Sequence, residues 1–276
     1  MNTITTPCPD RMAWDAARHQ ARHHLLAADG VPHDALALRL LGAEALELSG
    51  EPDRLPHEAA MRGFIAARNR FAEERLARAI AGGTHQAVIL GAGLNTLGFR
   101  PPYASSEVKI FEVDQPEMQA WKRARLAEIG AEIPQNLAFV SLDLDHDGLL
   151  PSLEAAGFNP MRPVFFVVLG LVPHLTYEMN DAIMRFISSL PRGEMVFDYL
   201  EPPANSAPDT RGVFETRSVD GRPACYFDAR GMEDIMELTN FRWFEDLDRA
   251  DMLAMFELPV QPWPGTPKAH VIHARA

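Results

Sequence analysis

The sequence has few of the features that mark secreted or membrane-spanning proteins. Its 276 residues include two cysteines, Cys8 and Cys225, which are too few for a disulfide framework and favour reduced thiols. The longest apolar run, near residues 164–172, has about half the length of a membrane-spanning helix. The first residues lack the basic and apolar segments of a secretory signal peptide. We therefore expect a cytoplasmic protein without a membrane span.

Positive charge is also scarce. Lys and Arg number 26 against 38 Asp and Glu, which gives a formal net charge of −12. Such an acidic balance disfavours a nucleic-acid backbone and an anionic membrane surface as partners. The composition leaves a small-molecule substrate as the expected partner.

The pattern of apolar residues changes near residue 86. Before it, Ala and Leu recur at three- and four-residue spacing, which predicts helices over residues 11–84. After it, short β-branched runs alternate with helix-like stretches, which predicts an α/β fold with a parallel sheet and right-handed crossovers. The expected strands are 87–90, 108–113, 137–141, 164–169 and 195–199, with a late strand at 268–273, and the expected helices are 116–129, 148–157 and 178–190.

This pattern predicts a single α/β domain, residues 86–276, with an N-terminal helical cap, residues 1–85. Residues 201–230 are rich in Pro, Gly and Asp and show no clear period. A long irregular segment inside an α/β domain is often functional, so we interpret residues 201–230 as a candidate lid or substrate loop.

A glycine-rich turn follows the first expected strand. It reads Gly91-Ala92-Gly93, and Gly98 lies further along. Glycines at such a turn let the backbone approach a ligand, and the next helix offers free N–H groups. The dinucleotide-binding pattern needs a third glycine where this chain has Thr96, which speaks against a nicotinamide cofactor. A tight strand-to-helix turn without a ligand is the alternative interpretation.

Acidic residues follow the second and third expected strands. Asp114 lies about 20 positions after the glycine turn, where a carboxylate can accept hydrogen bonds from both ribose hydroxyls. Glu112 alternates with it and is expected on the same side of the strand. A solvated acidic strand end is the simpler alternative for both residues.

The segment after the third strand has two interpretations. Residues 143–154 match the EF-hand calcium-loop pattern, but that loop needs a preceding helix and a strand is expected there. We therefore expect no metal, and interpret Asp143 as a nucleoside-facing carboxylate or as part of a polar loop.

Together these motifs resemble the S-adenosylmethionine-dependent leucine carboxyl methyltransferases, and the bacterial members most, including the tetracenomycin-type polyketide carboxyl methyltransferases. The resemblance covers most of the chain and is carried mainly by residues 87–94 and by residues 111–117 with Lys122. It implies a Rossmann-like class I methyltransferase fold, with a seven-stranded, mostly parallel sheet whose last strand is antiparallel, behind N-terminal helices.

The resemblance also assigns residues to the cofactor S-adenosylmethionine. Arg68 would hold the methionine carboxylate, and the Gly91-Ala92-Gly93 turn would line the methionine moiety. Asp114 would bind the ribose hydroxyls, and Asp143 and Leu144 would contact adenine. Several other arginines share the helix of Arg68, and only the resemblance selects it.

The chain departs from the family pattern beside the expected reaction centre. Asn95 and Leu97 replace the usual Asp and Arg, Leu169 stands where eukaryotic members have Glu, and His174 stands where Tyr is common. A carboxylate substrate is ionised at neutral pH and needs no general base, whereas a phenol or enol does. We name His174 and Tyr199 as candidate catalytic residues, with a surface histidine and a packed aromatic ring as the alternatives.

These observations predict an S-adenosylmethionine-dependent O-methyltransferase acting on a carboxylate of a small molecule or secondary metabolite. One alternative is a non-methylating relative, such as a cyclase or a ligand-binding protein, which the departures at Asn95, Leu97 and Leu169 would suit. The other is a nicotinamide-dependent oxidoreductase.

Overall fold

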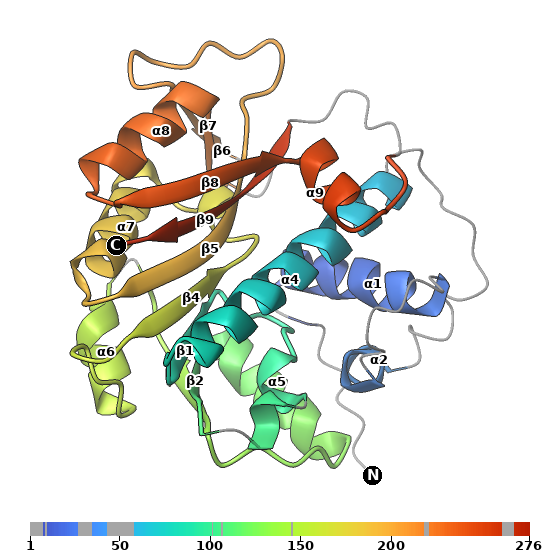
Figure 1. Cartoon of the computed structure of the whole chain (residues 1–276). Helices are drawn as coiled ribbons and strands as arrows, with labels where there is room; N and C mark the ends of the chain where they lie inside the picture. Colours follow the sequence, from blue (N-terminus) through green and yellow to red (C-terminus); the bar gives the residue numbers. More distant parts are fainter. Residues whose placement is uncertain are drawn as a thin grey trace.

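A seven-stranded sheet forms the centre of the molecule (Figure 1). The computed structural model describes residues 8, 10–26, 35–42, 58–100, 102–105, 107–144, 146–217, 221–260 and 268–276. The strands are β1 (Gln86–Leu90), β2 (Lys109–Asp114), β3 (Leu137–Ser141), β4 (Val164–Val168), β5 (Gly193–Leu200), β8 (Trp243–Asp248) and β9 (Ala269–Arg275). Their order is β3-β2-β1-β4-β5-β9-β8, and β9 runs antiparallel to both of its neighbours. The predicted mostly parallel sheet with an antiparallel last strand is therefore confirmed.

The central strands form because their side chains are apolar on both faces. Every residue of β1 and of β4 is buried. Val88 and Phe166 belong to the core on one face of the sheet, while Ile89 and Val167 belong to the core on the other. Near-continuous apolar strands are typical of a parallel sheet that helices cover on both sides.

The helices form a layer on each face. They are α4 (Glu58–Ala81), α5 (Pro116–Glu128), α6 (Leu149–Ala155), α7 (Tyr177–Ser189), α8 (Ala229–Leu238) and α9 (Arg249–Met255). Phe71 of α4 and Leu253 of α9 pack into the core on one face, whereas Leu153 of α6, Met184 of α7 and Met232 of α8 pack into the core on the other. The predicted helices at 116–129, 148–157 and 178–190 are thus confirmed as α5, α6 and α7.

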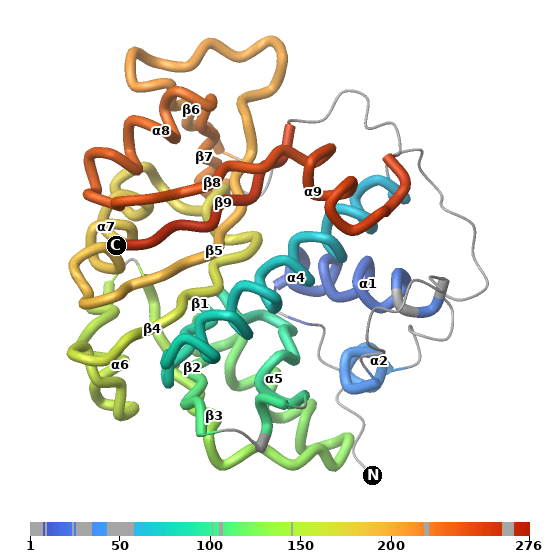
Figure 2. The backbone as a smooth tube through the Cα atoms, in the orientation of Figure 1, coloured from blue at the N-terminus to red at the C-terminus, as the bar shows by residue number. Residues whose placement is uncertain are grey.

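Two further helices precede α4 in the chain. Helix α1 (Arg11–Leu26) lies beside α4, and α2 (Ala35–Leu41) packs near α1 (Figures 1 and 2). Ala17 and Ala21 of α1 share a small apolar cluster with Leu41, with Leu94 from the turn after β1 and with Met118 of α5. This cluster fixes α1 above the glycine turn. The division of the chain into a cap and a catalytic domain at residue 85 stays a prediction.

The expectation of irregular structure over 201–230 is wrong in part. This region contains a hairpin of β6 (Val213–Arg217) and β7 (Pro223–Phe227), which lies beside α8 (Figure 2). Cys225 and Phe227 are buried in the main core, so the hairpin is anchored by its second strand. Because Pro, Gly and Asp are frequent in this region, the short runs of residues that form the hairpin do not stand out in the sequence. Whether the hairpin acts as a lid stays a prediction.

Within the part of the chain that the structure describes, no helix is both long enough and apolar enough to span a bilayer. Cys8 and Cys225 both carry free thiols.

Candidate functional site

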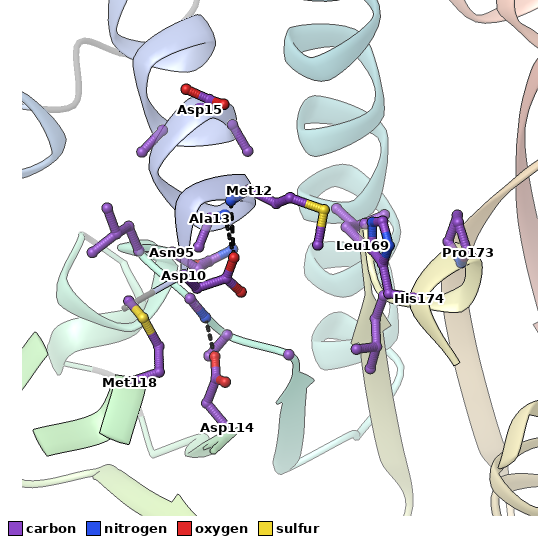
Figure 3. A pocket seen from close by; sticks show the side chains of 18 of the residues that line it. Asp10, Met12, Ala13, Asp15, Asn95, Asp114, Met118, Leu169, Pro173 and His174 are labelled. Atoms are coloured by element: carbon purple, nitrogen blue, oxygen red, sulfur yellow. Dashed lines mark hydrogen bonds between the residues drawn. The ribbon is translucent and has the colours of Figure 1, made fainter. Parts of the chain in front are cut away.

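A cavity of about 1020 Å³ lies at the carboxyl ends of the parallel strands (Figure 3). Its walls come from the turn after β1, the ends of β2 and β5, the segments after β3 and β4, helices α1 and α4, and the start of β7. In open α/β sheets, ligands bind outside the carboxyl ends of the strands where the strand order reverses. The reversal here is between β1 and β4, next to the glycine turn.

The glycine turn is shaped by two residues with positive φ. Gly91 has φ +69° and Gly93 has φ +46°, a region that favours glycine. A Cβ at Gly91 would lie 3.2 Å from Leu171, and one at Gly93 would lie 3.0 Å from the Cβ of Ala13 in α1. The bare backbone of this turn therefore forms part of the cavity wall, directly under α1.

The Asn95 side chain binds the backbone at the end of this turn. Its Oδ1 accepts a hydrogen bond of 2.8 Å from the Leu97 N–H at the start of the short 3₁₀ helix η1 (Leu97–Phe99). Asn95 also lines the cavity. The departure from the usual Asp therefore keeps an acceptor oxygen and removes a charge.

Asp114 is held in place at the end of β2. Its Oδ2 accepts the Gly93 N–H at 2.5 Å, and its Oδ1 accepts the Gln115 N–H at 2.7 Å. Burial raises the pKa of Asp114, and the two backbone donors oppose this effect. A carboxylate offers about four lone-pair sites, so two backbone bonds leave acceptor capacity for a ligand.

Glu112 does not join Asp114 in the cavity wall. It is fully buried beneath the turn, where its Oε2 lies 2.6 Å from Lys122 Nζ, and Lys122 also donates to the Asn95 carbonyl at 2.6 Å. Burial raises the pKa of Glu112, and the Lys122 charge opposes this. The pair supports the glycine turn from below.

Arg68 of α4 also lines the cavity, together with Asp198 of β5, which the sequence analysis did not predict as a site residue. The Arg68 guanidinium forms an ion pair with Asp198 of β5, and Asp198 also accepts the Gly170 N–H at 2.5 Å. Because Arg68 and Asp198 lie 130 positions apart in the chain, no local motif could indicate their contact.

Asp143 and Leu144 line the cavity next to β3. Asp143 Oδ2 lies 2.9 Å from Nδ1 of the exposed His146. A strand, β3, precedes this segment, and α6 begins at Leu149 inside the matched pattern, so the fold there is not an EF-hand. Asp145 lies outside the described residues.

The two candidate catalytic residues have different positions. His174 ends the 3₁₀ helix η3 (Val172–His174) and lines the cavity, where it lies beside Leu169 with Met12 of α1 pointing toward them (Figure 3). Tyr199 is buried and is not part of the cavity wall: its hydroxyl donates to Asp246 at 2.7 Å and its ring stacks on His270.

The position of Tyr199 corrects the expectation drawn from its place at the end of β5. Adjacent residues of a strand point to opposite faces, so Asp198 reaches the cavity and Tyr199 points away from it. Burial raises the pKa of Tyr199 well above its usual value, and Asp246 adds to the effect. This phenol is therefore a poor proton acceptor or donor for chemistry in the cavity.

Comparison with known protein families gives a match that covers most of the chain. Residues 12–188 match the leucine carboxyl methyltransferase family. The chain belongs to this family. The match includes Arg68, the glycine turn, Asp114, Asp143 and His174, and it confirms the resemblance seen in the sequence.

Individual relatives support the same assignment. A relative from Saccharopolyspora erythraea is 36% identical over 141 residues, which cover 51% of this chain and 48% of the relative. One from Mycolicibacterium gilvum is 35% identical over 167 residues, which cover 60% of this chain and 53% of the relative. Both carry names of S-adenosyl-L-methionine-dependent methyltransferases. The chain spans about half the length of these curated relatives.

Two solved structures match this chain at low sequence identity and with TM-scores below 0.5. The N-terminal domain of EvdMO1, solved with S-adenosylhomocysteine and D-fucose, has a TM-score of 0.49 and 15% identity, and covers 82% of this chain and 85% of its own. Magnesium protoporphyrin IX methyltransferase from Synechocystis has a TM-score of 0.48 and 13% identity, and covers 82% and 89%. The assignment of this chain to the class I methyltransferase fold rests on its strand order, β3-β2-β1-β4-β5-β9-β8.

Proposed function

We propose that this protein is an S-adenosylmethionine-dependent methyltransferase that transfers a methyl group to an oxygen, and specifically to a carboxylate, of a small molecule. The observation that carries the proposal is the position of Asp114. Its carboxylate is fixed at the end of β2 by Gly93 and Gln115, beside a turn of bare backbone, in a member of a methyltransferase family.

The cavity wall fits the cofactor in several places. Arg68 would bind the methionine carboxylate, and its buried Nε has no hydrogen-bond partner among the described residues. The turn from Gly91 to Gly93 would lie against the methionine chain, in space that a Cβ would otherwise narrow. Asp114 would accept the ribose hydroxyls, and Asp143 with Leu144 would face adenine. S-adenosylmethionine supplies an electrophilic methyl group on a sulfonium when it is bound.

The protein contributes orientation and exclusion of water. Holding a nucleophile in line at near-attack distance can lower a barrier by roughly 7–11 kcal/mol. Met12, Leu169 and Leu171 give the cavity an apolar wall near His174. A carboxylate nucleophile is already ionised, so His174 would serve as a hydrogen-bond donor that orients it rather than as a base.

The cavity is large for a pocket that binds a single ligand. Pockets that bind one drug-sized ligand measure about 300–1,000 Å³, and this cavity of about 1020 Å³ lies just above that range, which supports a substrate beside the cofactor. Met61, Phe64 and Ile65 of α4 line it together with Met12 of α1. These apolar side chains suit the body of a small organic acid.

Binding and product formation test the proposal together. Calorimetry should detect binding of S-adenosylhomocysteine, and melting curves should shift upward with it but not with NAD. Mass spectrometry of a panel of small carboxylic acids, phenols and enols should find one CH₂ added to a carboxylic acid. Stabilisation by NAD alone would overturn the assignment.

A cofactor-binding protein without methyl transfer is the second candidate. Leu169 gives the cavity wall an apolar side chain, and the Asn95 side chain is engaged with the Leu97 N–H. Tight binding of S-adenosylmethionine with no methylated product from any acid, phenol or enol in the panel would favour this function.

A further inference from the structure

We infer that Asp198 binds the α-ammonium group of the cofactor and so completes a clamp with Arg68, which the proposed function already assigns to the α-carboxylate. The inference rests on the proposed function and deepens it. It assigns a ligand contact to Asp198, which within the described part of the chain contacts Arg68 and Gly170.

Asp198 lies in the cavity wall with its charge nearly enclosed by protein. It is 4% exposed, and Arg68 is 9% exposed. One carboxylate oxygen faces the Arg68 guanidinium and the other accepts the Gly170 N–H. About two of its four lone-pair sites remain for a donor from the cavity, and an ammonium group supplies three N–H donors.

Gly170 makes this arrangement possible. Its φ is +70°, and a Cβ there would lie 3.4 Å from Arg68 Nη2. A side chain at position 170 would be strained by this φ, and its Cβ would be in contact with the guanidinium. The turn after β4 therefore leaves room for Arg68, and its backbone N–H orients Asp198.

Stability alone does not account for a charged pair at this position. The cost of removing two charges from water often exceeds their attraction, and well-packed apolar residues serve as well or better. A buried ion pair is therefore weak evidence of a role in stability, and this one lines a cavity. Phe64 lies under Arg68, with the guanidinium carbon 5.8 Å from the ring centroid, so the cation is fixed from a second side.

The chemistry of the pair matches an α-amino acid. Such a group carries a carboxylate and an ammonium on the same carbon, so its two charges are adjacent and sum to zero. The Arg68–Asp198 pair is also neutral overall and presents the two opposite charges side by side. A planar guanidinium is well suited to a carboxylate, and a carboxylate accepts charge-assisted bonds from an ammonium group.

Calorimetry with two ligands tests the clamp. S-adenosylhomocysteine has the amino-acid end, whereas 5′-methylthioadenosine lacks it and keeps the nucleoside. Asp198→Asn should weaken S-adenosylhomocysteine binding about thirtyfold or more and leave methylthioadenosine affinity within about twofold. Glu73→Gln is the matched control, because Glu73 also forms an ion pair with an arginine, Arg100, but neither residue is in the cavity wall, and it should change neither affinity. Equal losses for both ligands, or no loss for either, would overturn the clamp.

Two further measurements separate folding from binding. Asp198→Glu keeps the charge, and it should bind S-adenosylhomocysteine more tightly than Asp198→Asn. The unmodified protein should bind an S-adenosylhomocysteine analogue that lacks the amino group at least about tenfold more weakly than S-adenosylhomocysteine itself. Equal affinity for the two ligands would reject the ammonium contact, even if both Asp198 variants fail to fold. Failure of the unmodified protein to bind either nucleoside would instead reject the proposed function.

Discussion

The imidazole of His270 lies 3.0 Å from the carboxylate of Asp246, which ties β9 to the edge strand β8 by side chains as well as by the backbone. The other ring nitrogen of His270 lies 3.1 Å from Glu201, which follows β5. Burial disfavours the charged imidazole and lowers the pKa of His270. The hydrogen bonds from His270 to Asp246 and Glu201, together with the negative charges of these two residues, outweigh burial, so the pKa is raised. The His270 ring therefore connects three neighbouring strands.

This contact predicts a pH-dependent contribution to stability. A raised folded-state pKa means that the contribution is complete below the unfolded value of about 6.5 and is lost as the pH rises through the folded value. His270→Gln should lower the stability by about 2 kcal/mol at pH 6, or roughly 4–8 °C in Tm. The Tm difference from the unmodified protein should shrink toward pH 9.

The control for this prediction is His85→Gln, because His85 is exposed and should leave Tm unchanged at every pH. The comparison of variant with parent cancels the other titrating groups, among them His19, whose pKa is lowered by burial. A Tm difference that stays constant between pH 6 and pH 9 would show that His270 stabilises the sheet by packing alone.

The buried pair of Lys122 and Glu112 leads to a second prediction. Lys122→Met would leave the Glu112 carboxylate buried without its cation, and should destabilise the protein by about 3–5 kcal/mol at neutral pH. The loss should be smaller at low pH, where Glu112 is protonated and carries no charge. Chemical denaturation of the single variant and of the Lys122→Met/Glu112→Leu double variant measures this. Recovery of most of the stability in the double variant is expected, and additive losses would contradict the account.

The glycine turn gives a third prediction with a close control. Gly93→Ala and Gly83→Ala both place a side chain at positive φ, and each should cost roughly 1–2 kcal/mol of stability. A Cβ at Gly93 meets Ala13 of α1, whereas a Cβ at Gly83 meets nothing within 4 Å. Only Gly93→Ala should therefore also weaken binding of S-adenosylhomocysteine in calorimetry. Equal affinities of the two variants for S-adenosylhomocysteine would show that the glycine turn does not contact the ligand.

The sequence predicts the strands that are mostly apolar and misses the acidic edge strand β8. Strand β4 is apolar throughout and β1 is apolar after Gln86, and their positions were predicted to within one residue. Strand β8 contains Glu245, Asp246 and Asp248, which conceal its apolar positions. Glu245 and Asp246 contact histidines of β9, and a contact between distant segments leaves no local pattern in the sequence.

The same physical limit separates the predicted from the missed site residues. Asp114 and the glycine turn were predicted because they lie next to each other at strand ends, within one local motif. Asp198 was missed because its meaning depends on Arg68, on a different element. Tyr199 was placed on the wrong side because the end of a strand, without its register, does not say which face a side chain occupies.

Asp114 gives the most direct test of the cofactor site. Asp114→Ala would remove the acceptor for the ribose hydroxyls and leave the Gly93 N–H without its partner, so affinity for S-adenosylhomocysteine should fall about a hundredfold or more. Asp114→Asn keeps one acceptor oxygen and should lose less, about tenfold. Melting curves without ligand show whether each variant is folded, and calorimetry measures the affinity. Unchanged affinity in a folded Asp114→Ala protein would rule out the assignment of Asp114 to the ribose, because this variant has no carboxylate at position 114 to accept the ribose hydroxyls.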